Sequence, residues 1–201
     1  MTSRYQRMRQ RRDASTLRDE AFHWCRGRNP WVRLPLLAYA AWLTVRFALD
    51  LNYQPVFDAL NLGIHELGHV LFQPLGAFLG IAGGSLLQII VPVGSMFMFY
   101  RQRDFFAMTF CFAWLGMNLF DVAIYVADAR SMSLPLVSPF AGDPIHDWNY
   151  LLRRMGLLKQ DAVLAFLLRA AGFVCMGAFL WLGSLLVWKM HQSRESAPDS
   201  L

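Results

Sequence analysis

The last apolar stretch of the chain, residues 162–188, reads AVLAFLLRAAGFVCMGAFLWLGSLLVW. Its only charged residue is Arg169, and it contains no proline. A helix of about 20 apolar residues is long enough to cross the ~30 Å hydrocarbon core of a bilayer. This stretch therefore predicts a membrane-spanning helix, and the segments before it repeat the same pattern.

Four further apolar runs precede this stretch, and short polar breaks separate them. The expected spans cover residues 34–51, 56–73, 84–100, 105–127 and 162–188. In a bilayer every backbone amide must be hydrogen-bonded within the protein, and a helix meets this condition by itself. The sequence therefore predicts an all-α, polytopic membrane protein with about five transmembrane helices, which form a single transmembrane domain over residues 31–190.

The composition agrees with a bilayer as the solvent of this chain. Of its 201 residues, 56% are hydrophobic and 16% are charged, whereas soluble domains carry about 25% charged residues. Acidic residues are the scarcer kind, and only three of them are glutamates: Glu20, Glu66 and Glu195. This composition excludes a water-soluble globule, a disordered chain and a coiled coil.

Basic residues gather ahead of the first apolar run, where nine of the 19 Lys and Arg lie within the first 33 residues. We interpret residues 1–30 as a basic segment in the cytoplasm or on the membrane surface, and residues 191–201 as a polar tail. Because Lys and Arg favour the cytoplasmic side, the N-terminus is predicted to be cytoplasmic. Five alternating spans then leave four basic residues on the opposite side: Arg101, Arg103, Lys189 and Arg194.

The arginine-rich segment carries no zinc-finger or Gly–aromatic pattern, so we expect the lipid bilayer, and not nucleic acid, as its partner. The chain is compact and lacks the pattern of a cleaved signal peptide, which favours an integral protein of the bacterial inner membrane. Cys25, Cys111 and Cys175 do not have metal-ligand spacing and are expected to be small buried hydrophobes.

The second apolar run contains the motif His65-Glu66-Leu67-Gly68-His69, which is H-E-x-x-H on a predicted helix. The two histidines are one helical turn apart, so both imidazoles leave the same face and can bind one Zn²⁺. Zinc acidifies a bound water, and the neighbouring Glu66 can take its proton as a general base. Ionisable groups inside a membrane are costly and usually functional. This favours a metal site over hydrogen bonds that only hold helices together.

A transmembrane helix that carries His-Glu-Leu-Gly-His resembles the membrane-embedded zinc metalloproteases of the site-2 protease family. The resemblance implies intramembrane hydrolysis of peptide bonds, with His65 and His69 as zinc ligands and Glu66 as the catalytic base. It also implies an aspartate as third ligand, on a helix two spans further along the chain. In this sequence that helix is the run over residues 105–127.

The run over residues 105–127 contains Asn118 and Asp121, which are three residues apart and share a face. Asp121 is the third zinc ligand that the resemblance favours, and Asn118 is placed to orient the substrate or a ligand. The prolines that accompany the family's aspartate are absent here.

Two other places offer an alternative third ligand. Asp128 lies at the expected membrane edge, where it could equally pair with Arg130 or end the helix. His146 and Asp147 lie in a loop rich in Gly and Pro, where Asp147 could equally cap a helix over residues 148–155. Loops of this kind can fold back over a site, so these alternatives stay open.

A glycine-rich stretch with Gly83, Gly84 and Ser85 lies between the second and third expected spans. Glycines there could let backbone enter the membrane as a re-entrant segment that lines a water-filled cleft. The site-2 proteases hold an extended substrate near this position, so these three residues are expected to line a substrate cleft. Close packing of small residues between helices is the alternative interpretation.

Together these patterns predict an intramembrane zinc metallopeptidase that acts on a membrane protein or peptide. A different class, a non-catalytic metal-binding membrane scaffold or transporter, uses the same histidine pair. A zinc pathway would favour several ligand sets, whereas the sequence shows one compact cluster. A third possibility is a zinc hydrolase whose substrate is a lipid or a small amide.

Overall fold

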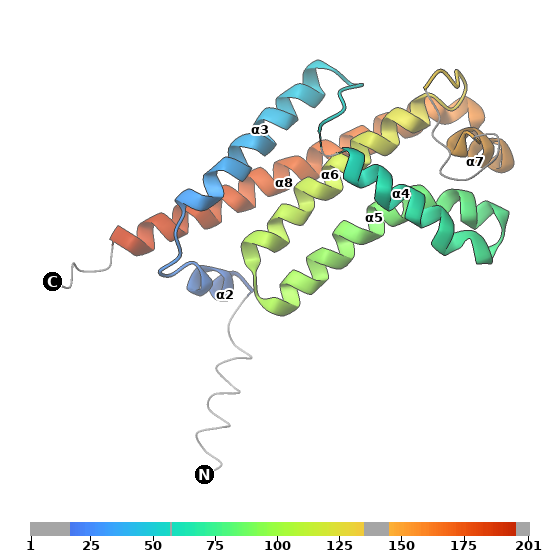
Figure 1. The fold of residues 1–201 in the computed structure, drawn as a ribbon. Coiled ribbons are helices and arrows are strands. Elements are labelled where there is room, and N and C mark those ends of the chain that lie inside the picture. Colours follow the sequence, from blue (N-terminus) through green and yellow to red (C-terminus); the bar gives the residue numbers. More distant parts are fainter. Residues whose placement is uncertain (1–16, 57, 135–144, 196–201) are drawn as a thin grey trace, which may run out of the picture.

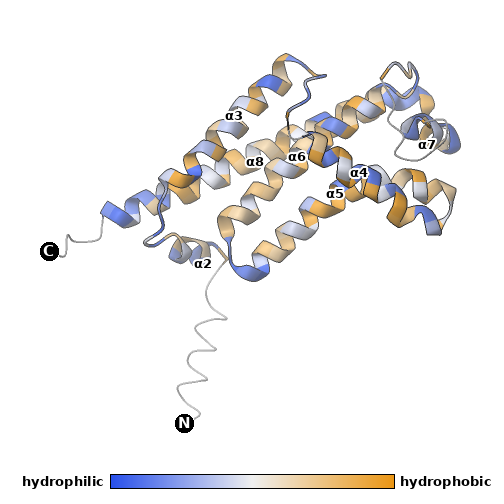
Figure 2. Ribbon diagram, viewed as in Figure 1, coloured by the Kyte–Doolittle hydropathy of each residue, from blue (hydrophilic) through white to orange (hydrophobic). Residues whose placement is uncertain are grey.

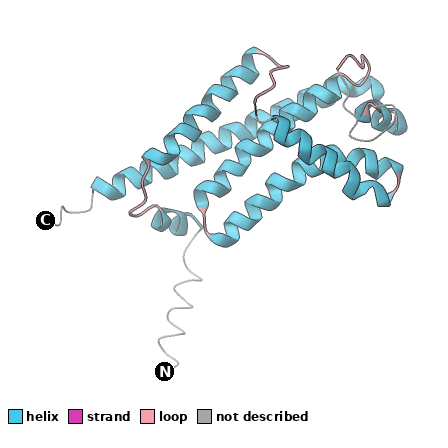
Figure 3. Cartoon of the chain, viewed as in Figure 1, coloured by secondary structure: helices cyan, strands magenta, loops and turns pink. Residues whose placement is uncertain are grey.

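The computed structural model describes residues 17–56, 58–134 and 145–195. Every regular element within these residues is a helix and none is a strand, which confirms the all-α prediction (Figure 3). The α-helices are α2 (Leu17–Trp24), α3 (Leu34–Leu49), α4 (Asp58–Phe72), α5 (Ala77–Gln102), α6 (Phe105–Ala127), α7 (Asp147–Met155) and α8 (Asp161–Glu195), as Figure 1 shows. Short 3-10 turns occupy Trp31–Arg33, Gln73–Leu75 and Leu158–Gln160.

Four helical segments in the described part of the chain are long and apolar enough to cross a membrane: Trp31–Leu49, Ala77–Gln102, Phe105–Ala127 and Leu158–Glu195. The chain is therefore a multi-pass α-helical membrane protein, and hydrophobic residues dominate these helices (Figure 2). The second expected span differs, because α4 has 15 residues. At about 1.5 Å per residue it is shorter than the ~30 Å hydrocarbon core.

Helix α6 lies at the centre of the bundle and is the most buried of the four apolar helices. It packs along α8, where Gly116 and Gly172 bring the two backbones close and Phe120 fills the space beside Gly172. Helix α3 covers the other side of α8, with Leu37 against Gly183. Lipid tails are as apolar as these side chains, so close packing of small residues, more than the hydrophobic effect, holds such helices together.

Helices α4 and α5 form a tight antiparallel hairpin around the turn at Gln73–Leu75 (Figure 1). The expectation of a re-entrant segment is wrong, because α5 runs through Gly83, Gly84 and Ser85 as regular helix. All three are buried, and a Cβ on Gly83 would lie 2.5 Å from the carbonyl oxygen of Gly68. The glycines therefore do what the alternative interpretation stated: they let two helices touch backbone to backbone, and each helix keeps its own hydrogen bonds.

Both described ends of the chain and the α5–α6 turn lie at the same end of the bundle. Arg103 pairs with Glu20, and the Cys25 thiol lies 3.6 Å from the carbonyl oxygen of Leu186. The prediction that placed the α5–α6 turn and the end of α8 opposite the N-terminal segment is therefore wrong. The reason is that α4 does not cross the membrane as a separate span but forms a hairpin with α5. The side of the membrane predicted for the ends of every later helix therefore changes.

The other end of the bundle holds α7, next to the C-terminal end of α6 (Figure 1). The region expected to be a polar loop thus contains a nine-residue helix. At the termini, α2 forms part of the basic segment and α8 continues to Glu195 into the expected polar tail. The expectations for residues 1–16 and 196–201 fall outside the described residues.

Candidate metal centre

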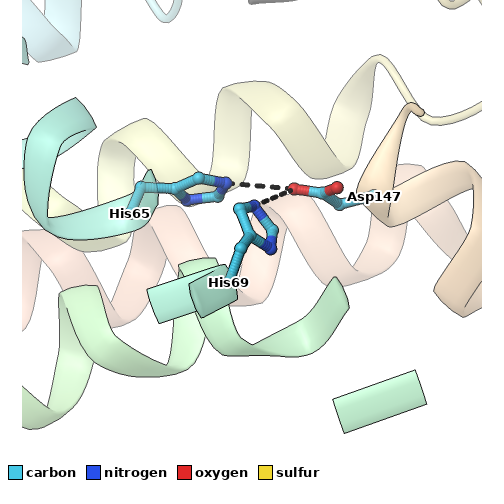
Figure 4. A group of neighbouring side chains, drawn as sticks. All are labelled: His65, His69 and Asp147. Carbon is cyan, nitrogen blue, oxygen red and sulfur yellow. Dashed lines mark hydrogen bonds and ion pairs between the residues drawn. The ribbon is translucent and has the colours of Figure 1, made fainter. Parts of the chain in front are cut away.

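Helix α4 presents its two motif histidines on one face, as the one-turn spacing requires. Their ring centroids are 4.7 Å apart. The Nε2 atoms of His65 and His69 lie 3.0 and 3.2 Å from the same carboxylate oxygen, Oδ2 of Asp147 (Figure 4). These residues form a mostly buried group whose ligand atoms all lie within 4.8 Å of one another, so the group can hold a metal ion.

Helix α7 brings Asp147 to the histidines and is fixed at several points. The indole N–H of Trp148 donates to Ser85 Oγ on α5 at 3.1 Å, and the Asn149 amide donates to the carbonyl oxygen of Ala129 at 2.6 Å. On its inner side Leu152 is fully buried. Ser85, expected to line a substrate cleft, therefore holds the helix that carries Asp147.

The two other alternative ligands, Asp128 and His146, pair with each other at 3.2 Å and lie outside the metal-binding group. His146 also caps α7, because its Nδ1 accepts from the backbone N–H of Asn149. Burial opposes the charge on Asp128, but hydrogen bonds from Ser131 and Ser133 outweigh it and hold the pKa of this carboxyl well below its usual value. Asp128 thus organises the loop after α6.

Asp121, the expected third ligand, does not reach the histidine nitrogens. Asp147 lies next to them instead. Its Oδ2 accepts a hydrogen bond from the amide of Gln88 at 2.6 Å, and Gln88 in turn contacts His65. The physical reason is the hairpin: the histidines of α4 meet the beginning of α7, near the end of α6, and Asp121 lies more than one turn deeper. Asn118 is fully buried, and its amide nitrogen donates to the carbonyl oxygen of Trp114 on its own helix at 3.2 Å.

The two imidazoles are oriented by acceptors at their other ring nitrogens. Nδ1 of His69 lies 2.9 Å from the carbonyl oxygen of Gly80, and Nδ1 of His65 lies 2.8 Å from Oε1 of Gln88. Oxygens of this kind only accept, so each Nδ1 carries a proton, and a neutral ring in this orientation presents the lone pair of its Nε2 to a metal ion. Metal-binding histidines are held in this way.

The donor set fits a divalent ion such as Zn²⁺. Two imidazole nitrogens and one carboxylate oxygen are the ligands of many catalytic zinc sites, which leave a fourth position open. Donors at about 2.0–2.2 Å from a tetrahedral ion lie 3.3–3.6 Å from one another, so the 3.0 and 3.2 Å separations need only a small adjustment.

Asp147 is ionised in this setting. Burial opposes its charge, but the hydrogen bonds to His65 and His69 outweigh burial and hold the pKa of the Asp147 carboxyl below its usual value. A deprotonated carboxylate is the form that binds metal. The remaining motif residue, Glu66, is partly exposed beside this group and has no hydrogen-bond partner among the described residues.

Sequence reasoning found the histidine pair and kept Asp147 among the alternatives, but it missed Gln88 and the Gly80 carbonyl. Gln88 could have been noticed as a lone amide within an apolar run. The Gly80 contact has no sequence signal, because any residue supplies a backbone carbonyl.

The chain matches no protein-family model, no curated protein and no solved structure. The resemblance to site-2 proteases rests on the H-E-x-x-H motif, whereas the carboxylate that meets the histidines comes from α7, outside the apolar spans.

Proposed function

We propose that this chain is an intramembrane zinc-dependent hydrolase that cleaves peptide bonds. The observation that carries the proposal is the convergence of His65, His69 and Asp147 on one point, directly beside Glu66 in sequence. A cluster of ionisable groups without a function would be costly in a membrane protein, because burial removes each charge from water.

The residues have distinct roles in this proposal. His65, His69 and Asp147 hold Zn²⁺, whose Lewis acidity makes water a stronger acid and a carbonyl more electrophilic. Glu66 accepts the proton of the attacking water and delivers it to the leaving amine. Asp147 lies outside the apolar spans, so the site is near one end of the bundle, where water is available to the reaction.

The proposed substrate is a membrane-anchored peptide that unwinds near one face of the bilayer. A peptide substrate is favoured by the resemblance of the motif to site-2 proteases. The substrate must unwind because amides inside an intact helix are hydrogen-bonded and shielded. Arg101, Arg103, Lys189 and Arg194 lie at the same end of the bundle as α2, which carries Glu20 and is followed by Cys25. With that end cytoplasmic, in a bacterial inner membrane, the metal site faces the opposite side.

Replacing Glu66 with glutamine tests the catalytic role. We expect Glu66→Gln to keep one zinc per chain, because the three ligands are intact, and to lose at least 100-fold in turnover, since general base catalysis contributes about 10²–10⁴-fold. Purified protein in liposomes is given single-span peptides with a Gly-Pro pair near either end, and mass spectrometry detects the products. Glu195→Gln, an exposed glutamate near the C-terminus, is the matched control and should cleave like the unaltered chain.

Cleavage by Glu66→Gln at the unaltered rate would contradict the proposed mechanism. If the unaltered chain binds zinc and cleaves no peptide, the peptidase assignment is wrong and the metal site serves binding alone. A chain that purifies without zinc and takes up none would remove the basis of the proposal.

A further inference from the structure

We infer that Asp121 is a positioning residue of the metal site and that it acts through Gln88. It fixes the direction of the Gln88 amide, and the amide fixes the tautomer of His65 that leaves Nε2 free for the metal ion. The inference rests on the proposed metal site and adds to it a residue that touches neither ion nor substrate.

The three side chains form one continuous chain of hydrogen bonds between helices. The Gln88 amide nitrogen lies 2.6 Å from Asp121 Oδ2, and its oxygen lies 2.8 Å from Nδ1 of His65. Gln88 is 1% exposed and His65 is 8% exposed, so no water competes freely for these bonds. The chain links α6 to α4 across α5, and it ends on the ring that faces Asp147.

The direction of each bond follows from what each group can do. The amide nitrogen of Gln88 donates to Asp121 Oδ2, so the NH₂ end of Gln88 faces Asp121. The oxygen of Gln88 then faces His65, whose Nδ1 must carry the proton. Its other nitrogen, Nε2, keeps the lone pair that binds metal. Without an acceptor at position 121, the amide can turn and donate to Nδ1, which moves the ring proton to Nε2 and blocks the metal-binding nitrogen.

His69 shows why this arrangement is specific to His65. The Nδ1 partner of His69 is the backbone carbonyl of Gly80, which has no donor form and cannot turn. The partner of His65 is a side-chain amide that can present either an oxygen or an NH₂ group. Only the His65 side of the site therefore needs a second residue to fix it, and Asp121 is in contact with that amide.

The experiment measures zinc affinity by competition with a chromophoric chelator, for detergent-purified full-length chains. We expect Asp121→Leu to weaken zinc binding about 10–100-fold, the usual effect of losing an outer partner of a ligand. The zinc affinity of Asp121→Asn should lie between those of Asp121→Leu and the unaltered chain, because its amide oxygen can still accept from Gln88. Asp50→Asn removes a carboxylate at the end of α3 that accepts from the backbone N–H of Asn52, and it should bind zinc like the unaltered chain.

A double-mutant cycle tests whether Asp121 acts through Gln88. In a Gln88→Leu background the change Asp121→Leu should cause no further loss of zinc affinity, whereas a general structural role would add its own loss. The absorption spectrum of bound Co²⁺ gives an independent readout. It should be unchanged by Asp121→Leu, which leaves all ligands in place, and altered by Asp147→Asn, which removes one.

The outcomes separate this inference from the proposed site. Unchanged zinc affinity in Asp121→Leu would overturn the relay and leave the site intact. A Co²⁺ spectrum altered by Asp121→Leu as it is by Asp147→Asn would make Asp121 a direct ligand and also overturn it. An additive cycle would show that Asp121 acts without Gln88. If the unaltered chain binds no zinc, the metal site itself fails.

Discussion

Gly84 is the single residue on which the position of His65 depends most directly. A Cβ at Gly84 would lie 2.5 Å from Nε2 of His65, closer than any unstrained contact. The imidazole therefore lies against the bare backbone of α5. The group of two histidines and an aspartate thus also requires a glycine, Gly84, in the neighbouring helix α5.

Gly84→Ala should displace the His65 ring and lower the zinc content of the purified chain to well below one per molecule. Overpacking of this kind costs about 1–3 kcal/mol, so the temperature of unfolding should fall as well. Gly94→Ala is the matched control on the same helix, because a Cβ there meets no atom within 4 Å. Elemental analysis of both variants is the measurement, and full zinc occupancy in Gly84→Ala would show that the ring can move aside.

At the scale of elements, α7 is the part of the site that depends most on the rest. It has nine residues, and isolated helices shorter than about 12–15 residues are marginal in water. Its position rests on the contacts of Trp148, Asn149 and Leu152, and on the meeting of Asp147 with the histidines. A bound ion would therefore fasten α7 to α4 as well as complete the site.

Removing the ion with a chelator should loosen α7 more than the other helices. We expect amide hydrogen exchange over Asp147–Met155 to become about 10-fold faster, because the ion then no longer joins Asp147 to the histidines of α4. The middle of α8, which makes no contact with the ion ligands, should exchange at an unchanged rate. Asp147→Asn should show fast exchange of α7 with or without chelator. Equal exchange rates of α7 in the unaltered chain and in Asp147→Asn, each with and without chelator, would mean that contacts within the protein alone hold α7.

At the scale of the whole molecule, the short helix α4 determines which ends of the other helices lie on the same side of the membrane. Because α4 is too short to cross, the described part of the chain has four helices that can span the membrane, and an even number of spans returns the chain to its starting side. The Glu20–Arg103 pair and the contact of Cys25 with Leu186 agree with this arrangement. The metal site then lies at the end of the bundle away from α2.

Reporter fusions can test this arrangement in cells. A fluorescent protein that matures only in the cytoplasm, fused at either terminus, should give the same result at both ends, and a fusion after Met155 should give the opposite result. The reason is the even number of spans before the C-terminus and the odd number before residue 155. Opposite results at the two termini would restore a fifth crossing, made by α4.

Much of this protein follows from local sequence. Apolar length predicts helices in a bilayer without reference to any distant residue, and the four long helices contain most of four of the five expected spans. The spacing of His65 and His69 is equally local, since a helix always brings positions four apart to one face. Glu66 stands out in the same way, as the single glutamate within an apolar run.

The rest depends on how the helices are arranged. The sequence determined a helical membrane protein with a histidine pair that is suited to a metal ion, because period and hydropathy are properties of short segments. Only the tertiary structure decided that Asp147 meets the histidines, that Asp121 lies behind Gln88 and that α4 is half of a hairpin. Those facts are distances between residues far apart in the chain, and they are set by the glycine contacts that let α4 and α5 pack backbone to backbone.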